Sequence, residues 1–179
     1  MGNGFSFWLG LVVLYILCSC STAPHSPRPF ILLSQVEKLK IGKDTGEQVQ
    51  KIVGIPDVKL PYKGEEEMEV WDYFEGETRA TPRLALGFSK TSGLLKMATW
   101  NLKQEDQDTS LDKIQNRFKK CDFKRYDATW TNPHSGPDYE FFEDPGNGLQ
   151  IVFSNTHQRV KSITWRLPND RSVSSHIEK

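Results

Sequence analysis

An internal repeat restricts the fold of this chain more strongly than any other feature of its sequence. The segment LALGFSKTSGLLKMATWNL (84–102) aligns without gaps with LQIVFSNTHQRVKSITWRL (149–167), at a constant offset of 65 positions. The identical pairs are Leu84/Leu149, Phe88/Phe153, Ser89/Ser154, Thr91/Thr156, Lys96/Lys161, Thr99/Thr164, Trp100/Trp165 and Leu102/Leu167. Average composition predicts about one identity in a window of this size. The alignment predicts two copies of one unit, repeating every 65 residues or so.

The repeat extends upstream of the aligned segments and predicts the fold class. The same offset pairs Val49 with Ile114 and Asp57 with Asp122. If three residues are inserted, an aromatic cluster also matches, which places WDYFE (71–75) on YEFFE (139–143). We therefore expect an α+β domain over 31–167, with repeats at 31–102 and 109–167. Each repeat would be a helix followed by three strands, and the strands would form one antiparallel sheet with the helices packed on one face.

Local signals place three helices in this domain. A capping box at Thr45–Gln48 predicts a helix that ends at Gly54, and a second box at Ser34–Glu37 predicts a short helix before it. In the second repeat the apolar spacing predicts a helix from about Ser110 to Lys120. The apolar residues expected on the buried stripes of these helices are Leu32, Val36, Leu39, Val49, Ile52, Val53, Leu111, Ile114 and Phe118.

Alternation along the strands predicts a buried face and an open face of the sheet. The core positions would be Leu84, Leu86, Phe88, Ala98, Trp100 and Leu102, with Leu149, Ile151, Phe153, Ile163, Trp165 and Leu167. The opposite face, which is small and polar, would be solvated or would bind a partner. Candidate partner-binding residues on that face are Thr99, Thr164, Arg166, Asp72, Phe74, Glu140 and Phe142. For Phe74 and Phe142 two interpretations stay open: they fill sheet edges, or they anchor a protein partner.

The first 19 residues read as a signal peptide. The apolar run from Phe5 to Leu17 is too short to cross a bilayer. Its end, LCSC (17–20), resembles a bacterial lipobox, which implies cleavage before Cys20 and acylation of Cys20 by lipid chains such as palmitate. An ordinary secretory signal, cut near Cys20 or Ala23, and myristoylation of Gly2 are the alternatives. We expect 20–30 to be a proline-rich tether and 168–179 a disordered tail.

Composition and motifs exclude several functions. Lys plus Arg and Asp plus Glu are both 23, so no basic excess favours nucleic acid. The four histidines are scattered without the spacing of a metal site, and no nucleophile elbow or phosphate-binding loop occurs. We expect no enzyme, no cofactor, no metal and no small-molecule substrate. Cys121 would be a small buried side chain without a disulfide.

A set of motifs resembles the SmpA/OmlA (BamE-like) family of outer-membrane lipoproteins. The motifs are LKIG (39–42), Thr45, QV (48–49), VGIP (53–56) and WDY (71–73), and the likeness covers about 34–102. Lys43 stands where the family usually has glycine. The tandem layout resembles that of the beta-lactamase inhibitory protein, without its disulfides. The resemblance implies an outer-membrane location facing the periplasm, and Ser21 after the lipidated cysteine fits the same sorting; secretion is the alternative.

The expected function is therefore non-catalytic. The first hypothesis is a membrane-anchored envelope lipoprotein that binds other proteins and assists outer-membrane protein assembly or envelope integrity. The second is an inhibitor-like module that presses its open sheet face onto a secreted or periplasmic hydrolase. In both, the partners are proteins of the cell envelope, and the membrane is reached through the lipid anchor.

Overall fold

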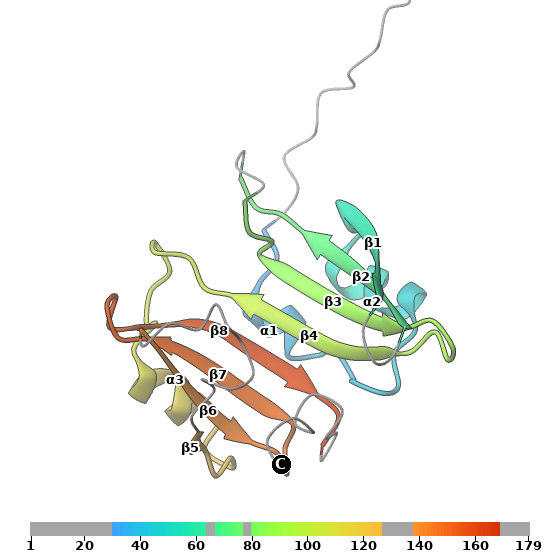
Figure 1. Cartoon of the computed structure of the whole chain (residues 1–179). Helices are drawn as coiled ribbons and strands as arrows, with labels where there is room; N and C mark the ends of the chain where they lie inside the picture. Colours follow the sequence, from blue (N-terminus) through green and yellow to red (C-terminus); the bar gives the residue numbers. More distant parts are fainter. Residues whose placement is uncertain (1–29, 64–66, 77–79, 127–137, 169–179) are drawn as a thin grey trace, which may run out of the picture.

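A computed structural model describes residues 30–63, 67–76, 80–126 and 138–168 (Figure 1). The chain is α+β, with an eight-stranded antiparallel sheet and a few short helices. The helices are α1 (Leu33–Val36), α2 (Gly46–Val53) and α3 (Leu111–Arg117). The strands are β1 (Val58–Lys63), β2 (Glu67–Tyr73), β3 (Leu84–Ser89), β4 (Leu95–Asn101), β5 (Lys124–Tyr126), β6 (Tyr139–Asp144), β7 (Leu149–Ser154) and β8 (Arg159–Arg166). None of the described helices is long and apolar enough to span a membrane.

The order of the strands divides the sheet at its centre. The strands run β1-β2-β3-β4-β8-β7-β6-β5, so two consecutive meanders meet where β4 pairs with β8 (Figure 1). In this junction Thr99 lies opposite Thr164, and Trp100 lies opposite Ile163. The two threonine hydroxyl oxygens are 3.1 Å apart and share a hydrogen bond. The junction therefore joins both meanders into one continuous sheet.

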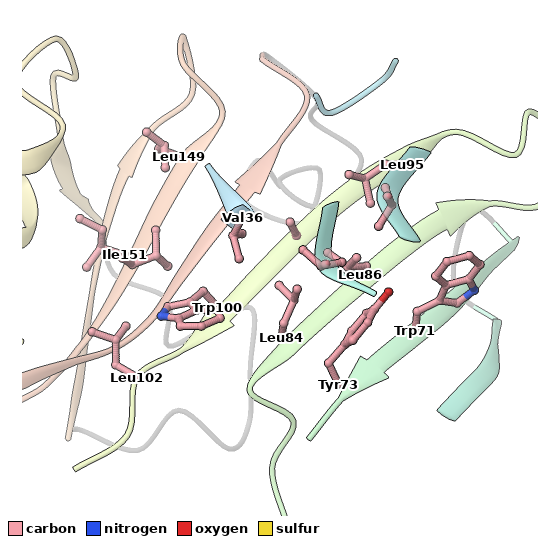
Figure 2. Close-up of a cluster of buried hydrophobic side chains, with 14 of the residues drawn as sticks. Val36, Trp71, Tyr73, Leu84, Leu86, Leu95, Trp100, Leu102, Leu149 and Ile151 are labelled. Carbon is pink, nitrogen blue, oxygen red and sulfur yellow. The ribbon is translucent and has the colours of Figure 1, made fainter. Parts of the chain in front are cut away.

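The helices lie on one face of this sheet and enclose the core. The Tyr73 hydroxyl donates a hydrogen bond to the Gly54 carbonyl at the end of α2, at 3.1 Å. The Phe118 ring, at the end of α3, meets Trp165 edge-on with 6.1 Å between centroids. Figure 2 shows buried side chains of both meanders in this core, among them Leu86 of the first and Ile151 of the second. The predicted core is confirmed at most positions, although Phe153, Trp165 and Leu167 are only half-buried.

Helix α2 begins and ends where the sequence predicts. The Thr45 N–H donates to the Gln48 side-chain oxygen at 2.8 Å, which is the reciprocal half of a capping box. At the other end Gly54 has φ of 91°, a conformation that favours glycine. Its apolar stripe is also as predicted, because Val49 and Val53 are buried.

The start of α1 and the end of α3 differ from the prediction, whereas α3 begins at its predicted cap, Ser110. Helix α1 begins at Leu33, and its N-cap is Leu32, whose N–H donates to the Gln35 side chain at 2.8 Å. The box predicted at Ser34–Glu37 is therefore wrong by two residues, and Leu32 is 59% exposed rather than buried. Helix α3 ends at Arg117, before the predicted Lys120, since the backbone of Phe118 already leaves the helical conformation.

Each of α2 and α3 is followed by four strands, so the predicted three strands are wrong. The missed strands are β1 and β5, which form the two edges of the sheet. In β1 every residue after Val58 is exposed, and Pro61 lies in its middle. Proline is tolerated only at edges, where its missing N–H costs no ladder bond. Because β1 lacks a buried apolar face and contains a proline, its sequence does not clearly indicate a strand.

The register also corrects the alignment of the aromatic clusters. Trp71 lies opposite Leu86, whereas the residue opposite Ile151 is Phe142. At the 65-residue offset that aligns Leu86 with Ile151, this pairing aligns Trp71 with Phe142 and not with Tyr139. The three inserted residues of the predicted alignment are therefore too few. A change of register by an odd number of residues moves every side chain of a strand to the other face.

Candidate functional site

The candidate binding residues do not all lie on one surface. Asp72, Thr99 and Thr164 occupy one row across the sheet, on the face opposite the helices, because Asp72 pairs with Ala85 and Ala85 pairs with Thr99. Arg166 is on this same face, in the next row, opposite Met97. We refer to this side of the sheet as the open face. The row of small side chains that the sequence predicts is thus present at the centre of the sheet.

Glu140 and Phe142 lie on the helix side, which contradicts their predicted place. Phe142 packs against the core and lies opposite Ile151. Glu140 pairs with Arg125, with 3.1 Å between the guanidinium nitrogen and the carboxylate oxygen. The prediction is wrong because the alignment was shifted by an odd number of residues. For Phe142 the interpretation as a filling side chain is confirmed.

Phe74 and Arg166 are held by contacts within the chain. Phe74 follows the end of β2 and is half-buried, and its N–H donates to the Asp57 carboxylate at 2.8 Å. The Arg166 guanidinium forms an ion pair with Glu143. The side chains of Arg166 and Glu143 are only 9% and 13% exposed. Because the charge of Arg166 is already neutralised, it is a poor site for an acidic partner.

Asp72 differs from the other charged residues of the open face. Its side chain is half-buried, and the described part of the chain offers it no hydrogen bond or ion pair to the carboxylate. Burial raises the pKa of the Asp72 carboxyl above its ordinary value, and no cation of the described residues opposes this effect. Asp72 is therefore a partly desolvated anion without a counter-ion from the described residues.

An apolar surface adjoins Asp72, and sequence reasoning did not find it. Leu60 and Tyr62 on β1 are 49% and 51% exposed. The half-buried Val70 and Met97 flank Gly87 on the neighbouring strands, with Met68 beside them, and Leu60 and Tyr62 lie beyond Val70 and Met68 on β1; we call these five side chains the methionine patch. The signal was present in β1 as the alternation of Val58, Leu60 and Tyr62, but the proline and lysines between them concealed it.

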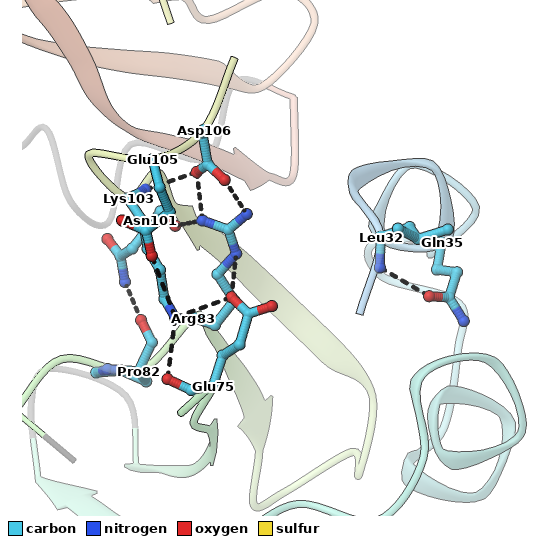
Figure 3. Close-up of polar contacts among 9 residues, drawn as sticks. All are labelled: Leu32, Gln35, Glu75, Pro82, Arg83, Asn101, Lys103, Glu105 and Asp106. Atoms are coloured by element: carbon cyan, nitrogen blue, oxygen red, sulfur yellow. Dashed lines mark hydrogen bonds and ion pairs between the residues drawn. The ribbon is translucent and has the colours of Figure 1, made fainter. Parts of the chain in front are cut away.

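A cluster of charges at the other end of β3 has a structural role. The Arg83 guanidinium lies 4.1 Å from the centroid of the Trp100 ring and donates to Asp106 and to the Asn101 carbonyl (Figure 3). Burial works to raise the pKa of Asp106, but the hydrogen bonds and charges of Arg83 and Lys103 outweigh it and lower this pKa. All of these groups are paired with one another, so the cluster is not a binding site.

The remaining candidates for chemistry are weak. A hollow of about 270 Å³ opens beside the start of α2, but the two aromatic residues that line it, Trp71 and Phe88, are buried in the core. Among the described residues no group of acidic, histidine and cysteine side chains could hold a metal ion. Burial, together with the charge and hydrogen bond of Asp144, raises the pKa of the Cys121 thiol, which disfavours the reactive thiolate.

Cys20 and the predicted leader, tether and tail lie outside the described residues, so the lipidation site stays a prediction. Comparisons with family models, with curated proteins and with solved structures find nothing that matches this chain. The fold and its surfaces therefore carry the functional argument alone.

Proposed function

We propose that this chain is a membrane-anchored envelope lipoprotein that acts as a non-catalytic protein-binding module. The observation that carries the proposal is the open face of the sheet, where Leu60 and Tyr62 expose large apolar side chains beside Asp72, a carboxylate without a counter-ion among the described residues. Exposed apolar patches rimmed by polar groups mark sites of protein interaction. A role in outer-membrane protein assembly or envelope integrity, as the SmpA/OmlA resemblance implies, is part of this proposal.

The proposal includes a duplicated unit. Thr99 lies opposite Thr164, its counterpart at the 65-residue offset, and the neighbours follow the same rule on both sides. Trp100 lies opposite Ile163, and Trp165 lies opposite Ala98. This register is the one expected if two copies of a unit pair through the same strand about a local twofold axis, as the subunits of a symmetric dimer do. It supports two tandem repeats, each with one helix and four strands.

The anchor is tested by a pair of cysteine substitutions. Cys20→Ala should release the protein from the membrane fraction and remove the acyl chains from its intact mass. Cys18→Ala is the matched control, because Cys18 leaves with the signal peptide and its loss should change neither property. Membrane fractionation and intact-mass analysis of the extracted protein give the result. A Cys20→Ala protein that stays with the membranes contradicts lipid anchoring. This result does not bear on the proposed binding by the open face of the sheet.

The class of partner is tested by affinity capture from envelope extracts with the full chain as bait. Subunits of an outer-membrane assembly machine support the first function, and a single hydrolase supports the inhibitor-like alternative. Capture of neither, with a correctly folded bait, contradicts the proposed binding module.

A further inference from the structure

The open face differs between the two meanders, whereas on the helix face both contribute buried apolar side chains to one core. In the first meander the register places Leu60, Val70, Gly87 and Met97 in one row across β1 to β4. In the second meander the Arg166–Glu143 ion pair lies across this face. The apolar row is thus a feature of the first meander, and the second meander carries a neutralised ion pair on the same face. We therefore expect a binding surface on the first meander.

Gly87 lies buried beneath the methionine patch. A Cβ atom at Gly87 would lie 3.5 Å from the Met68 sulfur and 3.7 Å from the Met97 Cβ, so the two methionine side chains cover this glycine. Methionine side chains are unbranched and adapt to irregular apolar groups, which suits a surface that receives another chain. The position 65 residues later carries Val152, which would fill the same space in the second meander.

Asp72 lies at the margin of this patch, two residues after Val70 on the same face of β2. On this face β2 and β3 contribute Met68, Val70, Asp72, Ala85, Gly87 and Ser89, among which only Asp72 is charged. A partly buried anion without a counter-charge costs free energy, and a cation brought by a partner would offset that cost. The surface is thus complementary to an apolar group that carries one positive charge.

The β1 edge of the sheet is poorly suited to binding a partner as an added strand. An added strand would pair with the outer side of β1, but Pro61 has no N–H to donate, and Lys59 and Lys63 flank it. Proline and lysine are features that protect an edge from pairing. A partner is therefore better placed over the face than along the edge.

From this geometry we infer that the methionine patch docks a protein segment which presents apolar side chains to Met68, Val70 and Met97 and one lysine or arginine to Asp72. The inference rests on the proposed binding function and assigns its surface and the chemistry of the partner.

The probe is a phage-displayed library of random peptides, selected on the full chain in detergent. The expected peptides carry a Lys or Arg among apolar residues. Asp72→Asn should weaken their binding about tenfold, as the loss of a partly desolvated ion pair would. Gly87→Val, which introduces the residue of the second meander, should also weaken it by displacing the Met68 and Met97 side chains that cover this glycine. Glu47→Gln, on the exposed side of α2, is the control and should leave binding unchanged.

Each outcome decides the inference. Thermal unfolding of every variant verifies that it is folded, and Asp72→Asn should not lower the melting temperature, because burial already disfavours the charged carboxylate. Enriched peptides that lack a basic residue, or that bind both variants as well as the parent, overturn the inference while the binding function stands. A folded parent chain that enriches no peptide also overturns it, and the capture experiment then judges the proposed function independently.

Discussion

At the scale of single residues, Arg83 organises the end of the first meander. Its side chain is 10% exposed, lies over the Trp100 ring and donates to Asp106 at 2.8 Å (Figure 3). Its Nε atom is 3.3 Å from the Glu75 carboxylate. A charge buried to this degree is tolerated only when it is paired. Arg83 therefore fixes the segment that leaves β4 against the start of β3.

Asp106→Asn should destabilise the protein in a pH-dependent manner. Because the folded state lowers the Asp106 pKa, the carboxylate contributes stability above the ordinary aspartate pKa, and this contribution is lost as the pH falls through the lowered value. We expect a loss of about 1–2 kcal/mol in the free energy of unfolding at pH 7, after allowance for partial exposure. Urea unfolding at pH 7, 5 and 3 measures it, and the difference from wild type should shrink at the lowest pH.

Asp108→Asn is the matched control, because Asp108 is exposed and its ion pair within the described part of the chain is with the exposed Lys113. Its φ of 60° is also acceptable to asparagine. An equal loss in both variants, or a loss at Asp106 that does not change with pH, would contradict the role assigned to the Arg83 cluster.

Two glycines with similar backbones should respond differently to alanine. Gly148 and Gly93 have φ of 64° and 69°. A Cβ at Gly148 would lie 2.1 Å from the Arg166 carbonyl oxygen, whereas nothing lies within 4 Å at Gly93. Gly93→Ala should cost about 1 kcal/mol from its backbone conformation alone, and Gly148→Ala about 3 kcal/mol or more. Chemical denaturation compares them, and equal costs would refute the close approach at Gly148.

At the scale of elements, the pairing of β4 with β8 decides how the two meanders combine. Thr164 is 8% exposed, and its hydroxyl shares a hydrogen bond with Thr99 across the junction. Threonine pairs directly opposite each other stabilise antiparallel strands. The pair therefore lies at the centre of the sheet, where the register of β4 and β8 fixes how the two meanders align.

A double-mutant cycle should detect this threonine pair. Thr164→Val leaves the Thr99 hydroxyl without its partner and should cost about 1 kcal/mol in the free energy of unfolding. Thr99→Val should behave alike, but the double variant should cost less than the sum, since no hydroxyl is then left unpaired. Urea unfolding of the four proteins gives the coupling energy. Strict additivity would show that the hydrogen bond contributes nothing to the junction.

At the scale of the whole molecule, the meanders share one buried core. The core cluster includes Val49 from α2 and Ile114 from α3. Glu37 next to α1 and Arg117 in α3 also form a two-point ion pair, with distances of 2.6 and 2.9 Å. The Leu102 N–H donates to the Lys161 carbonyl at 2.8 Å, which ties the segment after β4 to β8.

The described domain should therefore unfold in one cooperative step. If one meander unfolded alone, the central strand of the other would lose its pairing partner and become exposed. The free energy of this exposure couples the unfolding of the two halves. Differential scanning calorimetry should give a single transition whose calorimetric and van't Hoff enthalpies agree. Gly148→Ala, which lies in the second meander, should shift that entire transition. Two separate transitions, with only one shifted by Gly148→Ala, would show that the meanders are independent.

Local chemistry was enough to predict several parts of this fold. The start of α2 at Thr45 and its end at Gly54 depend on capping within a few residues, and both were predicted correctly. The antiparallel α+β class and the buried positions of β3 and β4 follow from alternation, which is a property of each strand by itself. Of the candidate site, Asp72, Thr99 and Thr164 were placed on the open face for the same reason.

What only the tertiary structure decided is which strands pair and in which register. Alternation divides the residues of β6 into two sets but does not say which set faces the helices. The prediction for Phe142 is therefore on the wrong face, and its pairing with Ile151 gives the correct one. Arg166 was predicted to be available, yet it is neutralised by Glu143 from a strand that is distant in sequence. The edge strand β1 buries too little to leave a local signal, and it contributes Leu60 and Tyr62 to the methionine patch only because the sheet places it beside β2.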